Sequence, residues 1–206
     1  MQVIRNKRAR IRLIALACVL GAATPAVAQF TDSFNFLKAV RDRDGTKVAE
    51  AVERPGSQIL NTKDYSTGEG ALHILVKRRD SGWLGYLLAK GAAVDIRDRE
   101  GNTPLLLACQ IGYLEGARGL LAEGADINAA NTRGETPIIL AVQGRDAALT
   151  QLLVTNGADP TRPDRIAGKT ARDYASQDAR GLALIKILDE AKPAKPAKPV
   201  MGPVAR

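Results

Sequence analysis

Apolar side chains recur along this chain in short blocks that glycine-containing turns separate. Leu105, Ala108 and Cys109 stand at the spacing of one helical face, and Leu120 and Leu121 belong to a second block that Gly124 closes. Residues three and four positions apart share a face of an α-helix, so this spacing predicts amphipathic helices. Two short helices in close succession, the second ended by glycine, predict an all-α chain built of helix pairs.

The pattern returns with a period of 33 residues. The motif GNTPL at Gly101 matches GETPI at Gly134, and counting back by 33 places GEGALH at Gly68 in the same frame. Counting forward by 34 from Gly134 reaches GKTA at Gly168. A period of this length indicates stacked repeats, in which each unit buries its apolar face only against its neighbours.

The recurrent residues have local physical reasons. Thr103 and Thr136 are placed to cap the first helix of their units, and the proline after each suits a position whose amide is unpaired anyway. Glycine suits the left-handed residue that ends the second helix, and aspartate suits the turn that follows. The residues at these two positions are Gly91, Gly124 and Gly157, and Asp95, Asp126 and Asp159.

These motifs resemble the ankyrin repeat, whose pattern runs G-x-T-P-L-H-x-A-A, then a helix ending in L-L, then G-A-D. The resemblance covers residues 34–190 and is strongest over 68–160. It implies an all-α solenoid of stacked helix-turn-helix units joined by β-hairpin-like fingers, with about three full repeats between degenerate terminal caps. His73 keeps the motif histidine, whose usual role in the family is a bond between repeats. Arg79 and Arg145 depart from the pattern, because they stand where Gly112 keeps the turn between helices.

Both ends are expected to close the stack. Residues 34–52 show helical periodicity with a turn at 42–45, and the last unit is expected to be covered by Tyr174, Leu182, Leu184, Ile185 and Leu188. The predicted organisation is therefore a signal peptide over 1–28, a repeat domain over 29–190 and a Lys/Pro/Ala-rich tail over 191–206.

The N-terminus has the pattern of a secretory signal peptide. Basic residues between Arg5 and Arg12 precede an apolar run over 13–23 that is too short to span a bilayer, and residues 26–28 (AVA) form a small-x-small cleavage site. We expect cleavage near Ala28 and a periplasmic or secreted product. Lipid attachment at Cys18 is the alternative. Cleavage leaves Cys109 as the single cysteine and excludes an intramolecular disulfide.

The net charge of +8 is concentrated at the two ends. Of the 30 basic residues, five lie in 1–28 and four in 192–206, so 21 remain against all 22 acidic residues between them. A region this close to neutral lacks the dense basic face that nucleic acids require, so we expect no nucleic-acid partner. The tail is expected to be an extended spacer, either without a role or in weak contact with an anionic surface.

Residues suited to catalysis or metal binding are scarce. His73 is the only histidine, no clustered Cys/His or H-E-x-x-H spacing occurs, and the GEG sequence at 68–70 lacks the third glycine of a phosphate loop. We therefore expect no enzymatic activity, no cofactor, no bound metal and no small-molecule substrate.

Function is expected at positions that the repeat leaves free. The resemblance implies a concave surface made by the fingers and the exposed side of each first helix. The predicted partner-binding residues on it are Ser66, Thr67, Glu69, Lys77, Arg78, Arg99, Glu100, Asn102, Gln110, Ile111, Thr132, Arg133, Glu135 and Gln143. Their mixed charges either favour a protein partner through directional pairs or serve solubility alone.

Three functions remain open for such a module, which we expect to be monomeric. It is an exported adaptor that binds a protein, a tether whose tail contacts anionic lipid or wall polymer, or a secreted effector that binds a host protein. Loss of membrane or wall association on deletion of residues 191–206 would distinguish the tether from the adaptor.

Overall fold

Short antiparallel helix pairs make up the computed structural model, which describes residues 25–55, 58–177 and 181–190. The inner helices are α1 (Pro25–Asp42), α3 (Ala71–Lys77), α5 (Pro104–Gln110), α7 (Pro137–Gln143) and α9 (Ala171–Ala175). The outer helices are α2 (Gly45–Glu53), α4 (Ser81–Ala89), α6 (Leu114–Ala122), α8 (Ala147–Thr155) and α10 (Leu182–Asp189), and a 3-10 turn η1 (Ile59–Asn61) precedes the first finger. Most of the predicted signal peptide and the whole predicted tail lie outside the described residues.

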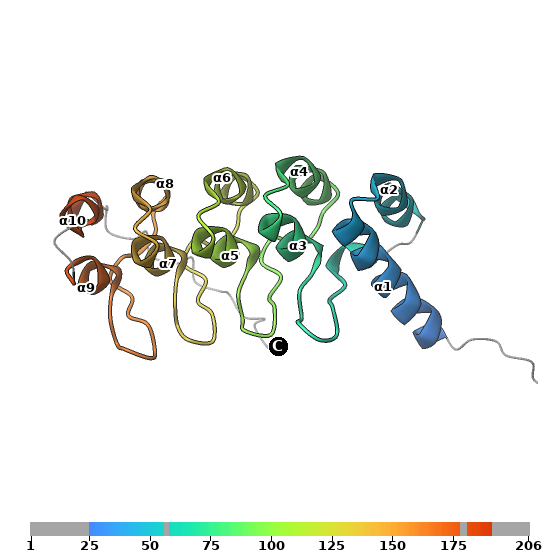
Figure 1. Ribbon diagram of the computed structural model, residues 1–206, viewed down its shortest axis with the longest axis horizontal. Helices are drawn as coiled ribbons and strands as arrows, with labels where there is room; N and C mark the ends of the chain where they lie inside the picture. The colour runs from blue at the N-terminus through green and yellow to red at the C-terminus, as the bar shows by residue number, and fades with distance from the viewer. Residues whose placement is uncertain (1–24, 56–57, 178–180, 191–206) are drawn as a thin grey trace, which may run out of the picture.

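The helices form two parallel rows, and the loops between pairs project as fingers from one side (Figure 1). Inner helices contact the inner helices of neighbouring pairs, as α5 does with α3 and α7, and α6 contacts the outer helices α4 and α8. This arrangement confirms the predicted all-α repeat solenoid, with three full pairs between a terminal pair at each end.

The core runs along the interfaces between repeats. Leu105 and Leu106 on α5 are fully buried, and so are Ile138 and Ile139, which stand 33 positions later on α7. Leu120 on α6 is equally buried. Each seven-residue inner helix is too short to be stable in isolation, so packing between repeats holds it in place.

The helix N-termini follow the predicted capping scheme with one exception. The Thr103 hydroxyl accepts the N–H of Leu106 at 3.3 Å, and Pro104 takes the first helical position. The prediction for Thr136 was wrong, because its hydroxyl makes no capping bond and its oxygen is buried without a hydrogen-bond partner. At this helix start only the Thr136 carbonyl acts as a cap, accepting the N–H of Leu140 at 3.1 Å.

The predicted glycine ends of the outer helices are confirmed. Gly91, Gly124 and Gly157 have φ of 90°, 83° and 89°, in the left-handed region that glycine adopts most readily. The N–H of the residue after each glycine bonds back into the last helical turn, as Ala125 does to the carbonyl of Leu120 at 3.0 Å. This bond satisfies a carbonyl that the helix leaves unpaired.

The terminal pairs differ from expectation at two apolar residues. Leu182, expected to cover the last repeat, is 71% exposed, whereas Leu184 and Leu188 on the same helix are buried. Phe34, which contributed to the predicted periodicity of α1, is also exposed, and Phe36 is buried instead. Figure 1 shows that the N-terminal turns of α1 extend beyond the row of inner helices. Within the described ranges, no helix combines the length and apolar character required to cross a membrane.

The carboxylate of Asp64 holds the first finger. It accepts the backbone N–H groups of Ser66 at 2.8 Å and Thr67 at 3.2 Å, and it pairs with the guanidinium of Arg41 on α1 at 2.7 Å. The Ser66 hydroxyl and then Arg41 donate to this carboxylate, and together with the backbone N–H groups they hold the pKa of Asp64 well below its ordinary value. The ion pair between Asp64 and Arg41 thereby ties the first finger to α1.

We expect Leu120→Ala to lower the free energy of unfolding by about 2–5 kcal/mol, because it leaves a cavity between repeats. Leu182→Ala should change it by no more than about 0.5 kcal/mol, since its side chain lies largely in solvent. Chemical denaturation followed by circular dichroism gives both values. Equal losses for the two variants would mean that the interior of the stack does not lie at α6.

We expect Asp64→Asn to be less stable than the parent chain at neutral pH, with the difference disappearing in acid. A carboxyl whose folded pKa is depressed contributes stability above its unfolded pKa of about 4, and this contribution is lost as pH falls towards the folded pKa. Denaturation midpoints measured across the acid range check this expectation. A stability difference independent of pH would show that Asp64 acts without its charge.

Candidate protein-binding surface

The tips of the fingers are joined to one another by backbone hydrogen bonds. The N–H of Arg99 donates to the carbonyl of Thr67 at 3.1 Å, and the N–H of Thr132 donates to Glu100 at 3.0 Å. The N–H of Arg165 donates to Arg133 at 2.8 Å in the same register. The same bond at the same place in successive fingers keeps neighbouring tips at a fixed spacing.

Glycine permits this close approach. Gly68 and Gly134 have φ of 73° and 79°, and a Cβ atom on either would lie 2.7 Å from the backbone nitrogen of the next finger, at Arg99 and Arg165 respectively. Two constraints therefore favour glycine at the first position of the repeat motif. The backbone there is left-handed, and the next finger occupies the space that a side chain would need.

An open groove of about 770 Å³ lies between the first two fingers and the inner helices α3 and α5. Its floor contains Leu107, which is buried, and Ile111, which is half-buried. Its other lining residues are Ser66, Thr67, Glu69, Lys77, Asp98, Arg99, Glu100, Asn102 and Gln110. The groove thus places apolar, acidic and basic groups within one concavity.

The structure brings nine of the fourteen predicted binding residues into this groove. They are Ser66, Thr67, Glu69, Lys77, Arg99, Glu100, Asn102, Gln110 and Ile111. Four others, Thr132, Arg133, Glu135 and Gln143, occupy the equivalent positions one repeat further on and do not line it. They extend the predicted strip along the fingers.

Arg78 does not belong to this surface. Its guanidinium donates to the carbonyls of Val40, at 2.8 Å, and Arg41 at the end of α1. Carbonyls in the last turn of a helix have no partner within the helix, so a guanidinium is well suited to them. The structure thus gives Arg78 a role in packing between the first two pairs, and its partner-binding role stays a prediction.

Asn102 lines the groove but is only 5% exposed, and its partner-binding role stays a prediction. Its side-chain amide donates to Asp98 at 3.1 Å, and its side-chain oxygen accepts from Asn131 of the next finger at 3.1 Å. These bonds join the second finger, which forms one wall of the groove, to the finger that follows it. A partner would meet Asp98 and Glu100 before it met Asn102.

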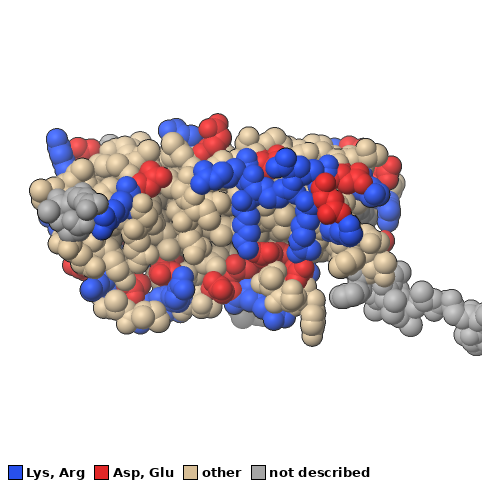
Figure 2. All heavy atoms as spheres, viewed as in Figure 1, with Lys and Arg blue, Asp and Glu red and all other residues tan. Residues whose placement is uncertain are grey.

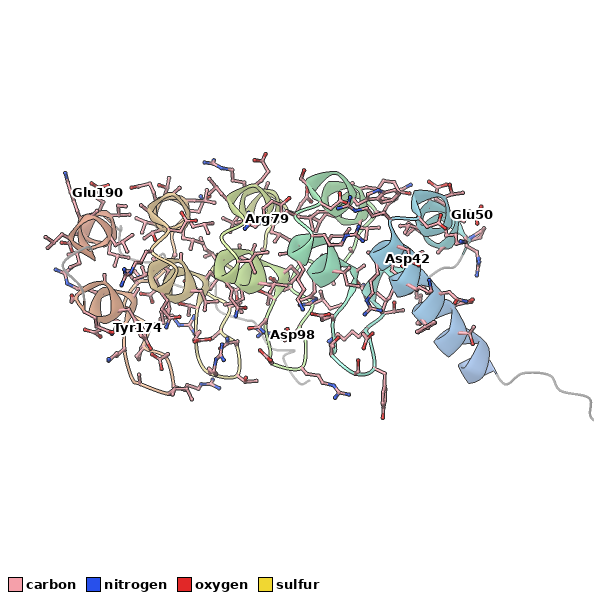
Figure 3. The ribbon with its side chains drawn as sticks, in the orientation of Figure 1. Asp42, Glu50, Arg79, Asp98, Tyr174 and Glu190 are labelled. Atoms are coloured by element: carbon pink, nitrogen blue, oxygen red, sulfur yellow. The ribbon has the colours of Figure 1, made fainter. Side chains whose placement is uncertain are left out.

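The charges of the groove are only partly neutralised by one another. Lys77 forms an ion pair with Glu69 across the groove wall. Arg99 donates to the carbonyl of Tyr65, and its guanidinium lies 5.7 Å from the centre of the Tyr65 ring. Figure 3 shows Asp98 on the finger side of the molecule, below the inner helices.

Sequence reasoning missed Tyr65, Asp98 and Leu107. Tyr65 is 82% exposed at the first finger tip, directly before the predicted Ser66. An aromatic residue in a predicted turn is a signal that could have identified it, since such side chains are frequent anchors at interfaces. Leu107 carried no such signal, because apolar residues stand on both sides of it in α5.

The two side chains most suited to catalysis, His73 and Cys109, are both buried inside the stack. His73 is fully buried; its Nδ1 accepts the N–H of Gly70 at 3.2 Å, and its Nε2 lies 2.9 Å from the carbonyl of Asn102. Burial lowers the pKa of His73, which favours the neutral ring with its proton on Nε2. Cys109 is a buried free thiol whose pKa burial raises. In the part of the chain that the structure describes, no group of three His, Cys, Asp or Glu residues is arranged to hold a metal.

The bond between His73 and the following repeat is the role that the family resemblance implied for this residue. Comparison with protein families supports the resemblance over residues 36–175. A model described as ankyrin repeats (3 copies) matches residues 36–131, and a model described as ankyrin repeats (many copies) matches residues 120–175. Helix pairs, finger register and sequence motifs thus agree, and the chain belongs to the ankyrin-repeat family.

Proposed function

We propose that this chain is an exported, non-catalytic adaptor that binds a protein partner in the groove between its first two fingers. Ankyrin repeats generally mediate protein–protein interactions. The groove is the observation on which this proposal rests, because it gathers exposed polar and charged side chains over an apolar floor in one concavity. The partner is a macromolecule that keeps part of its own surface in solvent, since the groove is open along its length.

The chemistry of the groove suits a polypeptide. Leu107 and Ile111 offer an apolar floor for an aliphatic side chain, while Glu100 and Lys77 present charges of both signs at the walls. Mixed charges select a partner by complementary placement, because a misplaced like charge is penalised. Exposed Tyr65 and Arg99 at the rim belong to the residue types that most often anchor interfaces.

Export is supported by the sequence and is compatible with the fold. The basic stretch, the apolar run over 13–23 and the AVA site at 26–28 supply the three parts of a signal peptide. Helix α1 begins at Pro25, so cleavage after Ala28 removes only its first four residues. Among residues 31–42 of α1, whose side chains the structure describes, the buried ones begin at Phe36 and remain in place.

The mature protein should therefore begin at Gln29. Intact-mass measurement of the protein purified from the cell envelope or the medium checks this, since cleavage removes the mass of residues 1–28. A full-length mass would contradict export by this signal. A diacylglycerol adduct at Cys18 would support the lipid-attached alternative.

Substitution of two exposed groove residues should weaken partner binding without unfolding the stack. Interface anchors contribute roughly 2 kcal/mol or more, so Arg99→Ala with Gln110→Ala should reduce affinity by about 30-fold or more. The melting curve should shift little, because both side chains are exposed. The measurement is affinity for a partner first captured from the envelope fraction and then purified.

The matched control lies on the opposite side of the same repeat. Glu115 and Arg118 are exposed on the outer helix α6, so Glu115→Ala with Arg118→Ala should leave affinity unchanged. Loss of binding in this control pair together with normal binding in the groove pair would place the interface on the outer helices instead.

A further inference from the structure

The left-handed backbone positions reveal a second surface. Three non-glycine residues of the described chain have positive φ, and all three are arginines: Arg43 at 60°, Arg79 at 54° and Arg145 at 55°. Each stands in the turn between the inner and outer helix of its pair, where the central repeat has Gly112 at 63°. These three residues are called the arginine edge below.

A left-handed conformation is unfavourable for arginine and easy for glycine, because of the Cβ atom. Gly112 shows that glycine fits this turn in the same chain. Non-glycine residues held in such backbone conformations are concentrated at functional sites. The side chains at these turns are therefore candidates for a role that glycine cannot fill.

An aspartate follows each of these arginines, yet its carboxylate is committed elsewhere. Asp44, Asp80 and Asp146 cap the outer helices by accepting the backbone N–H groups of Lys47, Trp83 and Leu149. This places each carboxylate against a helix N-terminus, where the positive end of the helix dipole balances it. The acids of these turns are thus used locally, and the side chains of Arg43 and Arg145 are exposed.

Arg79 extends the edge over the repeat that lacks an arginine. Its guanidinium donates to the carbonyls of Ile111 and Gly112, the latter at 3.1 Å, and lies 5.6 Å from the centre of the Tyr113 ring. A guanidinium carries five N–H donors, so further donors remain for an anion. Figure 2 shows Lys and Arg side chains gathered over the N-terminal half of this face, and Figure 3 places Arg79 among the helix ends rather than among the fingers.

We propose that the arginine edge binds an extended acidic segment of a partner protein. This surface adjoins the groove, since Arg79 donates to the carbonyl of the groove residue Ile111, but none of its three arginines lines the groove. Neighbouring helices pack about 8–10 Å apart, while a polyproline II segment advances about 3.1 Å per residue and returns every third side chain to the same face, so a carboxylate at every third residue would match one repeat. Arginine suits this task because its planar guanidinium pairs with carboxylates in a defined geometry.

The spacing of charge favours a polypeptide over other anions. Duplex DNA carries one charge per about 1.7 Å, a density that calls for a continuous basic face. The arginine edge offers three cations over four helix pairs, with aspartates between them, and residues 29–191 carry 21 basic against 22 acidic side chains. A sparsely acidic segment matches this arrangement, whereas a polyphosphate backbone would meet repulsion at each aspartate.

The test uses the mature chain and a fluorescent synthetic peptide of about twelve residues with glutamate at every third position, measured by anisotropy at low ionic strength. Replacing the arginine edge with glycine (Arg43→Gly, Arg79→Gly, Arg145→Gly) should weaken binding at least about ten-fold, since exposed ion pairs act through charge. Replacing the same three residues with lysine retains the charge and should preserve binding within a few-fold. If the triple variant loses its helical circular dichroism spectrum, peptide affinity is measured in the double variant Arg43→Gly with Arg145→Gly. This variant keeps the bonds of Arg79.

Four outcomes would overturn the proposal. They are unchanged peptide affinity in the folded glycine variants, equal affinity for a matched lysine peptide, and tighter binding of a short DNA duplex or of phosphatidylglycerol vesicles than of the acidic peptide. The fourth is loss of peptide binding in Arg99→Ala with Gln110→Ala, because the peptide would then occupy the groove. Failure of the arginine edge leaves the adaptor function untouched, since that function is measured with the captured partner.

Discussion

Apolar contact between successive inner helices is the interaction on which the rest of this structure depends. The inner helices α3, α5 and α7 have seven residues each, fewer than an isolated helix needs in water. Leu106 and Ile139 are fully buried in these helices. Because the stack fixes each inner helix, it also fixes where each finger leaves its helix pair. The positions of the groove and of the arginine edge therefore follow from this packing.

The sequence predicts this packing well, since the features that specify it are local and repeat. A period of 33 residues, threonine and proline at helix starts and glycine at helix ends were enough to place the pairs and their turns. The bond from His73 to the next repeat followed from the family resemblance. Each of these features is decided by a few neighbouring residues, so one chain without structural information carries it.

The binding surface was predicted less completely, because neighbouring repeats compete for its side chains. Arg78 and Asn102 occupy positions that the repeat leaves free, yet partners 38 and 29 residues away take up their polar groups. Thr136 has the same motif as Thr103, but its hydroxyl has no capping bond. Leu182 is apolar and periodic, yet it is exposed at the end of the stack. Side-chain geometry across repeat boundaries decides such cases, and sequence periodicity does not report it.

The contacts of Arg78 and Arg79 make the two ends of the solenoid unequal. These adjacent residues donate in opposite directions, Arg78 to the last turn of α1 and Arg79 to the turn after α5, so they link three successive helix pairs. At the other end α9 packs against α7 and α10 against α8, whereas at the N-terminal end α1 contacts α3 but α2 has few contacts with α4. Local opening in repeat proteins spreads from the weakest interface. The bonds of Arg78 to the end of α1 therefore reinforce the more sparsely packed end, next to the helix pair that carries the first wall of the groove.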